Sequence, residues 1–274
     1  MKRLVALGLV IALVLTLALP LAVSATSISG QVLSQPTITH VYLHGTTTPA
    51  SGLITASTPS SPIALDIEGT NFDTTSGDPV PAVTTSATAG AITVSAVSVS
   101  SSTLLYATFV VAAGTISGNY DVMVTQGGRT SSTSSADYFL VKSYGTVSAP
   151  SDISLGLMSI GIPATANGAG SIVTNDASWT VSVKDSTNTA NAGHMSISGT
   201  GTGILGTNVL TEPFLISKDN VPADYAAANL GISLTGTYSS SGSALPMYVS
   251  QTVDSNDGAG SYSITITFTF SPKY

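Results

Sequence analysis

Residues 65–72 read Leu-Asp-Ile-Glu-Gly-Thr-Asn-Phe, and this stretch decides the fold predicted for the first half of the chain. Leu65 and Ile67 are two residues apart, so on an extended strand they point to one face while the two acidic side chains point to the other. Gly69 ends the alternation, Thr-Asn supplies turn chemistry, and Phe72 places a large apolar ring beyond the turn. The stretch therefore predicts a half-buried strand with a glycine kink and an aromatic plug, as at the edge of a β-sandwich.

The first 25 residues have the pattern of a secretory signal peptide. Lys2 and Arg3 make the start positive, residues 4–19 are apolar apart from Thr16, and Val23-Ser-Ala25 matches a signal-peptidase site. We therefore expect cleavage after Ala25 and a secreted or cell-surface protein. The alternative is an uncleaved anchor, because residues 4–23 are nearly long enough to cross a bilayer. No other segment is apolar enough to span one, so we expect no membrane partner after cleavage.

The composition excludes several functional classes. Removing residues 1–25 takes away two of the seven Lys and Arg residues and none of the 14 acidic ones. An acidic chain without a basic cluster does not neutralise phosphates, which argues against nucleic acid as a partner. The absence of cysteine rules out disulfides, cysteine–zinc sites and thiol nucleophiles. Charged residues make up only 8% of the chain, so neutral polar side chains must cover most of the surface.

Short alternating segments separated by turn-forming residues continue to residue 141. After a lead-in at 26–35, strands are predicted from residue 37 to about 44 and at 63–72, 80–84, 92–99, 104–111, 120–125 and 136–141. The segment at 92–99 is expected to carry a bulge near Ala96, because its alternation is reset there. About seven short strands without a convincing helix are typical of an immunoglobulin-type Greek-key sandwich.

Several motifs in this segment resemble an IPT/TIG domain. Pro36-Thr-Ile38 and Leu65-x-Ile67-x-Gly69-x-Asn71-Phe72 are similar to the first strands of that domain. Its closing strands are matched by Ser102–Leu105 and by Gly118–Val124, which contains Tyr120, and its end by Phe139–Val141. The resemblance covers about residues 35–141. It implies an immunoglobulin-like module of the kind that serves surface proteins as a spacer or interaction domain. The signal peptide and acidic balance do not fit the family's DNA-binding branch.

A second domain is predicted beyond a linker at 142–152, which contains Gly145, Ser148 and Pro150. Residues 153–274 carry expected strands at 153–157, 171–174, 179–183, 195–198, 214–217, 232–235, 247–253 and 261–270. Asn167-Gly-Ala-Gly170 and Asp257-Gly-Ala-Gly260 are predicted to be similar turns. The fold class predicted is therefore all-β, with domain 36–141 and domain 153–274 forming two tandem immunoglobulin-like Greek-key β-sandwiches after the signal peptide.

Two features are expected to organise this second sandwich. The last strand alternates without a break, so one apolar face is formed by Tyr262, Ile264, Ile266, Phe268 and Phe270. Trp179 is the only tryptophan and is predicted to lie in the core. The run Ser178-Trp179-Thr-Val181 also weakly resembles the WxL domains that hold bacterial surface proteins on peptidoglycan, but valine replaces the leucine and the second tryptophan motif is missing.

Few residues offer chemistry. His40 and His44 share a strand face, but four extended residues separate them by about 13 Å, too far to share a metal without a bend. An acidic turn formed by Asp254, Asn256 and Asp257 is a candidate for binding calcium. The candidate is weak, because the spacing lacks the acidic residue that completes an EF-type loop, and the alternative is a simple turn without a metal. The chain contains no Gly-x-Ser-x-Gly or His-Glu-x-x-His motif. We therefore expect no enzyme, no cofactor and no metal.

Three functions remain open at this stage. The first is a non-catalytic secreted or cell-surface protein with an adhesive, scaffold or interaction role toward an extracellular protein or polysaccharide. The second is a carbohydrate-binding protein, and its test is whether two or three tyrosines form an exposed row on one sheet; the tyrosines considered are Tyr42, Tyr106, Tyr144, Tyr238 and Tyr248. The third is a homo-oligomeric extracellular filament in which residues 26–35 add a strand to a neighbour.

Overall fold

The computed structural model describes residues 34–52, 59–73, 80–134, 137–186, 191–197 and 208–273. The chain is all-β, with a single short 3-10 helix among the described residues, η1 (Pro222–Asp224). The expected signal peptide and almost all of the lead-in lie outside the described residues. None of the helices in the described ranges is long and apolar enough to span a membrane.

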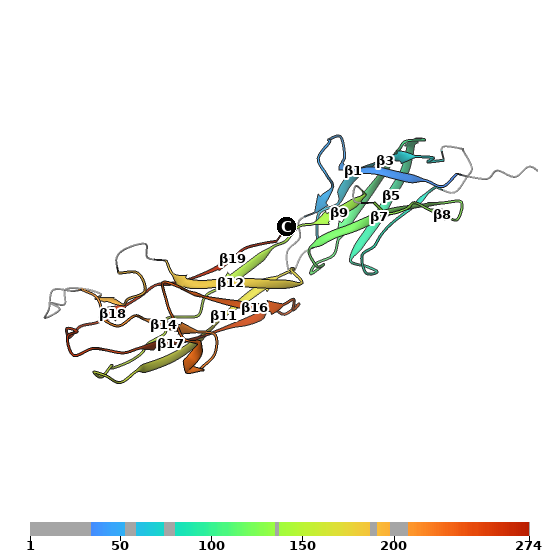
Figure 1. The fold of residues 1–274 in the computed structure, drawn as a ribbon. Coiled ribbons are helices and arrows are strands. Elements are labelled where there is room, and N and C mark those ends of the chain that lie inside the picture. The colour runs from blue at the N-terminus through green and yellow to red at the C-terminus, as the bar shows by residue number, and fades with distance from the viewer. Residues whose placement is uncertain are drawn as a thin grey trace, which may run out of the picture. The chain divides into compact units, whose positions relative to one another are not determined.

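The first region, defined here as residues 34–141, consists of two sheets around one hydrophobic cluster (Figure 1). One sheet has the order β1-β3-β6-β5, formed by Thr37–Leu43, Ile63–Thr70, Leu104–Val111 and Ile92–Ser101. The other has the order β2-β9-β7-β4, formed by Ser51–Gly52, Tyr138–Val141, Gly118–Gln126 and Ala82–Thr85, with β8 (Arg129–Thr130) paired to β7. Alternate residues of both sheets point into the cluster, which makes this region a β-sandwich.

The stretch at 65–72 lies at the centre of this region. Leu65 and Ile67 are fully buried in β3 and Phe72 is 2% exposed. Gly69 lies against β1 so closely that a Cβ atom there would come within 1.9 Å of the Thr37 carbonyl oxygen. Asn71 follows in the left-handed conformation, with φ 62°, and its side-chain amide donates a hydrogen bond to the Gln35 carbonyl. The close approach of β1 therefore requires glycine at 69, and the left-handed backbone favours asparagine at 71.

Two further predictions in this region concern β5 and β7. The bulge predicted near Ala96 is confirmed, because the β5–β6 register shifts between Ser95 and Ser98 and Ala96 has φ 48°. Tyr120 of β7 packs against the cluster, and its hydroxyl donates to the Ile116 carbonyl. Burial raises the pKa of Tyr120.

The second region, residues 142–273, has its own hydrophobic cluster. Its larger sheet has the order β10-β11-β17-β14-β15, formed by Gly145–Ser148, Ala164–Thr174, Ser243–Gln251, Leu215–Ser217 and Ala226–Ala227. The second sheet has the order β16-β12-β19, formed by Ile232–Thr237, Ser178–Asp185 and Ile266–Phe270. A short pair is formed by β13 (Ser196–Ile197) and β18 (Tyr262–Ser263).

Trp179 of β12 belongs to the second cluster and is 5% exposed. Its indole N–H donates to the Thr237 carbonyl, and its ring lies over Gly236, where a Cβ would approach to 2.3 Å. The indole is thus used in packing, with its one polar group satisfied by the neighbouring strand.

Three local predictions for the second region are wrong. Residues 167–170 are not a turn but the middle of β11, paired along their length with β17. Residues 153–157 form no strand, whereas residues 145–148 of the expected linker do form one, β10. The expected strand at 261–270 is interrupted at residues 264–265, because β18 pairs with β13 while β19 pairs with β12. The apolar side chains of this segment are only partly buried against the cluster: Tyr262, Ile264, Ile266, Phe268 and Phe270.

Candidate functional site

The register of the first sheet gathers ionisable and aromatic side chains on its outer face. Tyr42 of β1 lies opposite Asp66 of β3, and Asp66 lies opposite Tyr106 of β6, so the three form one row across the sheet. In the next row His40 lies opposite Glu68. The intervening residues of these strands point into the core, so both rows face away from it. We call these residues, together with His44, the histidine–tyrosine face: His40, Tyr42, His44, Asp66, Glu68 and Tyr106.

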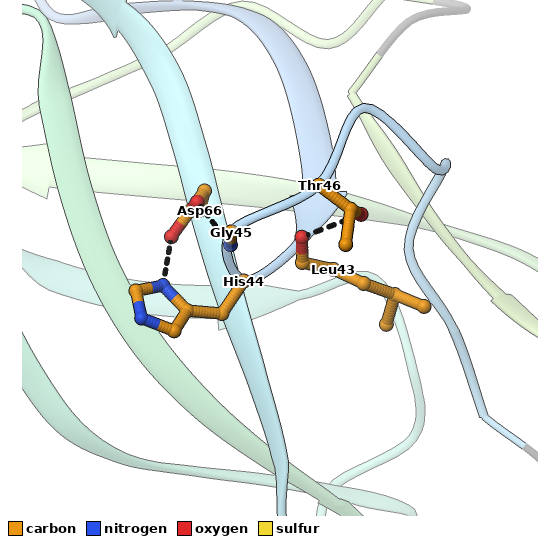
Figure 2. Close-up of polar contacts among 5 residues, drawn as sticks. All are labelled: Leu43, His44, Gly45, Thr46 and Asp66. Carbon is orange, nitrogen blue, oxygen red and sulfur yellow. Dashed lines mark hydrogen bonds and ion pairs between the residues drawn. The ribbon is translucent and has the colours of Figure 1, made fainter.

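Asp66 orders one end of this face through both carboxylate oxygens (Figure 2). Its Oδ1 lies 2.6 Å from Nδ1 of His44, and its Oδ2 accepts a hydrogen bond from the Gly45 amide at 2.9 Å. Gly45 has φ 72°, a left-handed conformation that glycine adopts without strain. The Thr46 hydroxyl, also shown in Figure 2, donates to the Leu43 carbonyl and closes the turn. The imidazole is therefore held by an ordered turn, although its side chain is 57% exposed.

The contact with Asp66 also fixes which nitrogen of His44 is free. An ionised carboxylate only accepts hydrogen bonds, so Nδ1 carries the proton that it shares with Asp66. In the neutral imidazole, Nε2 then presents a lone pair to solvent. The His44 ring meets Tyr106 edge-on, with the ring centroids 5.2 Å apart and an interplanar angle of 88°. One imidazole, one phenol and one carboxylate thus form a single contact group.

His40 and Tyr42 form a second aromatic pair on the same face. Their rings stack with centroids 5.2 Å apart and an interplanar angle of 10°. Nδ1 of His40 lies 3.9 Å from Oε2 of Glu68, and both side chains are about half exposed. This is a loose, solvent-screened pair that leaves both groups available to a ligand.

Two open hollows adjoin this face. One, of about 430 Å³, lies beside His44, Tyr106 and Thr108, with the small side chains of Ala64 and Ala96 in its lining. The other, of about 400 Å³, includes Glu68 and Leu104 together with Thr39, Ser101 and Thr103. The bulge at Ala96 contributes to the first hollow, which is a common use of bulges beside binding sites. The two hollows adjoin neighbouring rows of one sheet, an arrangement suited to an extended ligand.

Among the described residues, the contacts of this face do not complete a catalytic or metal site. Within the described ranges no group of three or more His, Asp or Glu residues is placed to hold a metal ion. Asp66 and His44 are arranged as the orienting half of a Ser-His-Asp triad, but among the described residues no hydroxyl hydrogen-bonded to His44 is found. Hydrogen bonding and ring stacking are therefore the chemistry that this face offers.

The weak calcium candidates act as turn residues. The Asp254 carboxylate accepts from the backbone and side-chain amides of Asn256, while Asp257 accepts from the Asp254 amide and, through its other oxygen, from Thr211. Oδ1 of Asp254 and both carboxylate oxygens of Asp257 thus accept from protein donors, as in an ordinary Asx-type turn.

The tyrosines considered for sugar binding separate into two groups. Tyr42 and Tyr106 share the histidine–tyrosine face, whereas Tyr144, which packs against the first cluster, and Tyr238 and Tyr248 of the second region do not belong to it. Burial raises the pKa of Tyr144, and nearby Tyr238 adds to the rise. Only the first pair lies in one row of a sheet with a carboxylate between them.

Sequence reasoning placed His40 and His44 on one strand face and named Tyr42 and Tyr106 as sugar-binding candidates, but it did not assign Asp66 or Glu68 to a site. Strand alternation already put Asp66 and Glu68 on the polar face of β3. What was missing is the register between β1, β3 and β6, which decides the cross-strand neighbours. The His44-Gly45 pair just after a strand was the one local signal of an ordered turn.

No protein-family model matches the chain, and no curated protein matches it. A solved structure, the Yersinia pseudotuberculosis adhesin InvE, is similar at a TM-score of 0.36 and 14% sequence identity. The alignment covers 85% of this chain and 58% of that chain, so this chain spans less than two thirds of the adhesin chain. A similarity at this level says nothing about a shared ligand. The resemblances to IPT/TIG and WxL domains remain predictions from the sequence.

Proposed function

We propose that this chain is a non-catalytic secreted or cell-surface protein that binds an extracellular partner through the histidine–tyrosine face. The observation that carries the proposal is the row Tyr42–Asp66–Tyr106, flanked by His44 and His40 on the outer face of one sheet. The extracellular setting rests on the signal-like residues 1–25. An adhesive or interaction role needs a surface of this kind and no reacting group.

The face is ordered before a ligand arrives, which favours binding. His44 is fixed by Asp66, and Tyr106 and Tyr42 are each in contact with an imidazole. Groups held in place by their neighbours lose little conformational freedom on binding, so more of the contact energy appears as affinity. Aromatic side chains with a polar tip also have few rotatable bonds and large contact areas, and they dominate many binding surfaces.

A carbohydrate is the ligand class that this face favours over a protein ligand. Sugars offer an apolar ring face and a rim of hydroxyl groups, which match aromatic rings beside groups that both donate and accept hydrogen bonds. Here Tyr42 and Tyr106 flank a carboxylate, and Nε2 of His44 is free to accept from a hydroxyl. The two hollows leave open space beside these side chains at neighbouring rows of the sheet.

A glycan array probed with the wild-type chain and with the Tyr106→Ala variant tests this function. We expect wild type to be retained on at least one polysaccharide and Tyr106→Ala to bind it about fivefold more weakly, since one aromatic contact contributes about 1 kcal/mol. Tyr225→Ala is the matched control, because Tyr225 is a partly exposed tyrosine of the second region. Equal binding by wild type and Tyr106→Ala contradicts the proposed surface. Retention on an extracellular protein alone, lost in Tyr106→Ala, keeps the surface and excludes the carbohydrate.

A further inference from the structure

An apolar turn in the second region exposes aliphatic side chains to solvent. Of the six large hydrophobic side chains that are exposed in the described part of the chain, three lie within six residues: Leu157 at 102%, Ile160 at 64% and Ile162 at 63%. Single exposed hydrophobic residues are normal on protein surfaces, but a local concentration marks an interaction site. We call residues 156–162 the apolar turn.

The backbone of the apolar turn is held by hydrogen bonds within the protein. The Ile162 amide donates to the Ser159 carbonyl, and Gly161, with φ 73°, donates to the Val253 carbonyl at 2.9 Å. Ile160 also pairs with Val253 in an isolated bridge. The aliphatic side chains are therefore carried by a fixed turn, and both of these amide donors are satisfied. This matters in an apolar environment, where an unpaired amide is heavily penalised.

The segment that contains the turn is free of charge, since residues 153–175 contain no Asp, Glu, Lys, Arg or His. The first charged residue on the paired segment is Asp254, next to Val253, and its Oδ1 is hydrogen-bonded to Asn256. Moving the turn into an apolar phase therefore requires no charged side chain of this segment to lose its hydration. A protein partner would not demand such a long uncharged segment, since protein interfaces normally have a polar, charged rim.

The size of the exposed patch also argues against a second copy as the occupant. Three aliphatic side chains present roughly 200–350 Å² of apolar surface, from the usual relation between transfer energy and area. A stable protein–protein interface buries about 800 Å² on each partner. Insertion into a lipid surface needs no shape-complementary partner, and its strength scales with the apolar area buried.

We propose that the apolar turn inserts into the surface of an electrically neutral lipid bilayer. The chain has no basic cluster to attract anionic lipids, so contact depends on the aliphatic side chains alone. This proposal departs from the sequence-based expectation of no membrane partner after signal cleavage. It involves peripheral contact with a bilayer and no second spanning segment. Insertion of the apolar turn does not depend on ligand binding by the histidine–tyrosine face, and the two are tested by separate experiments.

Quenching by brominated lipid tests this insertion at the turn itself. The Leu157→Trp variant carries an indole at the tip, and Leu230→Trp is the matched control, because Leu230 is 79% exposed and lies outside the uncharged segment. Each variant is mixed with phosphatidylcholine vesicles whose acyl chains are brominated. Because the quencher acts only on indoles within the acyl region, an apolar segment retained at the N-terminus does not produce the signal. The urea midpoint of each variant, followed by circular dichroism, establishes that both fold.

We expect Leu157→Trp to lose emission and shift to the blue with brominated vesicles, while Leu230→Trp remains unquenched. An unquenched Leu157→Trp in a folded protein overturns the proposal. A blue shift that depends on protein concentration and occurs without lipid also overturns it, because it assigns the turn to contact between copies. A further variant, Leu157→Trp with Ile160→Ser and Ile162→Ser, should lose most of the quenching; unchanged quenching would show that the neighbouring isoleucines do not insert and would refute insertion of the turn.

Discussion

The outer faces of two sheets built on the same alternation differ sharply in what they present to solvent. On the β1-β3-β6-β5 sheet of the first region, the outward rows contain two imidazoles, two phenols and two carboxylates, and each imidazole contacts one phenol and lies beside one carboxylate. On the β16-β12-β19 sheet of the second region, the outward positions are almost all hydroxyl residues paired across the strands: Ser178 with Thr237, Thr180 with Thr235, Ser182 with Ser233 and Thr269, and Lys184 with Thr267.

This difference shows that the same strand geometry can present very different side chains to solvent. Short hydroxyl side chains suit a solvated sheet and offer little area to a ligand, whereas rings and carboxylates offer both area and directional hydrogen bonds. The inward faces are similar in kind, since each region buries alternating aliphatic and aromatic residues in its own cluster. The two regions are thus alike in how they are stabilised and different in what they can bind.

The strongest test of separate cores is a large-to-small substitution in one of them. Phe109 is fully buried in the first cluster and packs against Phe139 with ring centroids 5.3 Å apart. Phe109→Ala should lower the unfolding free energy of the first region by about 3–5 kcal/mol, through lost transfer energy and a residual cavity. Circular dichroism reports both regions, whereas fluorescence reports the second, because Trp179 is the only tryptophan.

For this variant we expect an earlier transition by circular dichroism and an unchanged fluorescence midpoint. Phe109→Leu serves as the control, since it keeps most of the apolar volume and should shift the transition less. If the fluorescence midpoint moved as far as the circular dichroism transition, the two clusters would unfold as one cooperative unit.

Two strand glycines sharpen the comparison between the regions. A Cβ on Gly69 would meet the Thr37 backbone carbonyl at 1.9 Å, whereas a Cβ on Gly168 would meet the end of the Ile153 side chain at 2.8 Å and the Pro150 ring at 3.0 Å. A backbone carbonyl in a strand pair cannot rotate away, but a side-chain terminus can. Gly69→Ala should therefore destabilise the first region by about 2–3 kcal/mol, and Gly168→Ala should destabilise the second by less than about 1 kcal/mol. Shifts of the urea midpoint from wild type that are equal for the two variants would contradict this account.

A smaller effect is expected for the carboxylate that orders the histidine–tyrosine face. Asp66→Ala removes the acceptor of both His44 and the Gly45 amide, and should lower the unfolding free energy by about 1 kcal/mol in this partly exposed setting. Glu68→Ala is the matched control on the same strand, because its 3.9 Å pair with His40 is exposed and should contribute less than about 0.5 kcal/mol. The urea midpoint checks both, and a larger shift for Glu68→Ala would show that Asp66 does not organise the face.

The first region was easier to predict from the sequence than the second. In residues 65–72 the apolar residues, the glycine and the asparagine all indicate the same local structure, so strand, kink and plug follow from the residues themselves. At 167–170 the glycines indicated a turn, but Ile153 and Pro150 pack closely over Gly168 and Gly170, which is the other role of glycine in a strand. The alternation of residues 261–270 is real, but two different partner strands divide it. The alternation of apolar and polar residues shows which face of a strand is buried, but it does not show which strand pairs with it.

The same limit applies to the site. The outward direction of His40, His44 and Asp66 follows from the period of two, but the contact between His44 and Asp66 depends on which residues of β1 and β3 lie opposite each other. The turn at Gly45 sets that contact, because its amide and the imidazole reach the same carboxylate.

The most direct test of the histidine–tyrosine face is the proton NMR spectrum of the three histidines during titration with the polysaccharide retained most strongly on the array. His40 and His44 lie on the face, whereas His194 belongs to the second region, where its Nδ1 is hydrogen-bonded to the Leu210 carbonyl. The account predicts that the ring resonances of His40 and His44 shift with ligand concentration while those of His194 stay in place. Shifts confined to His194, or the same shifts in the Tyr106→Ala variant at equal ligand concentration, would contradict it.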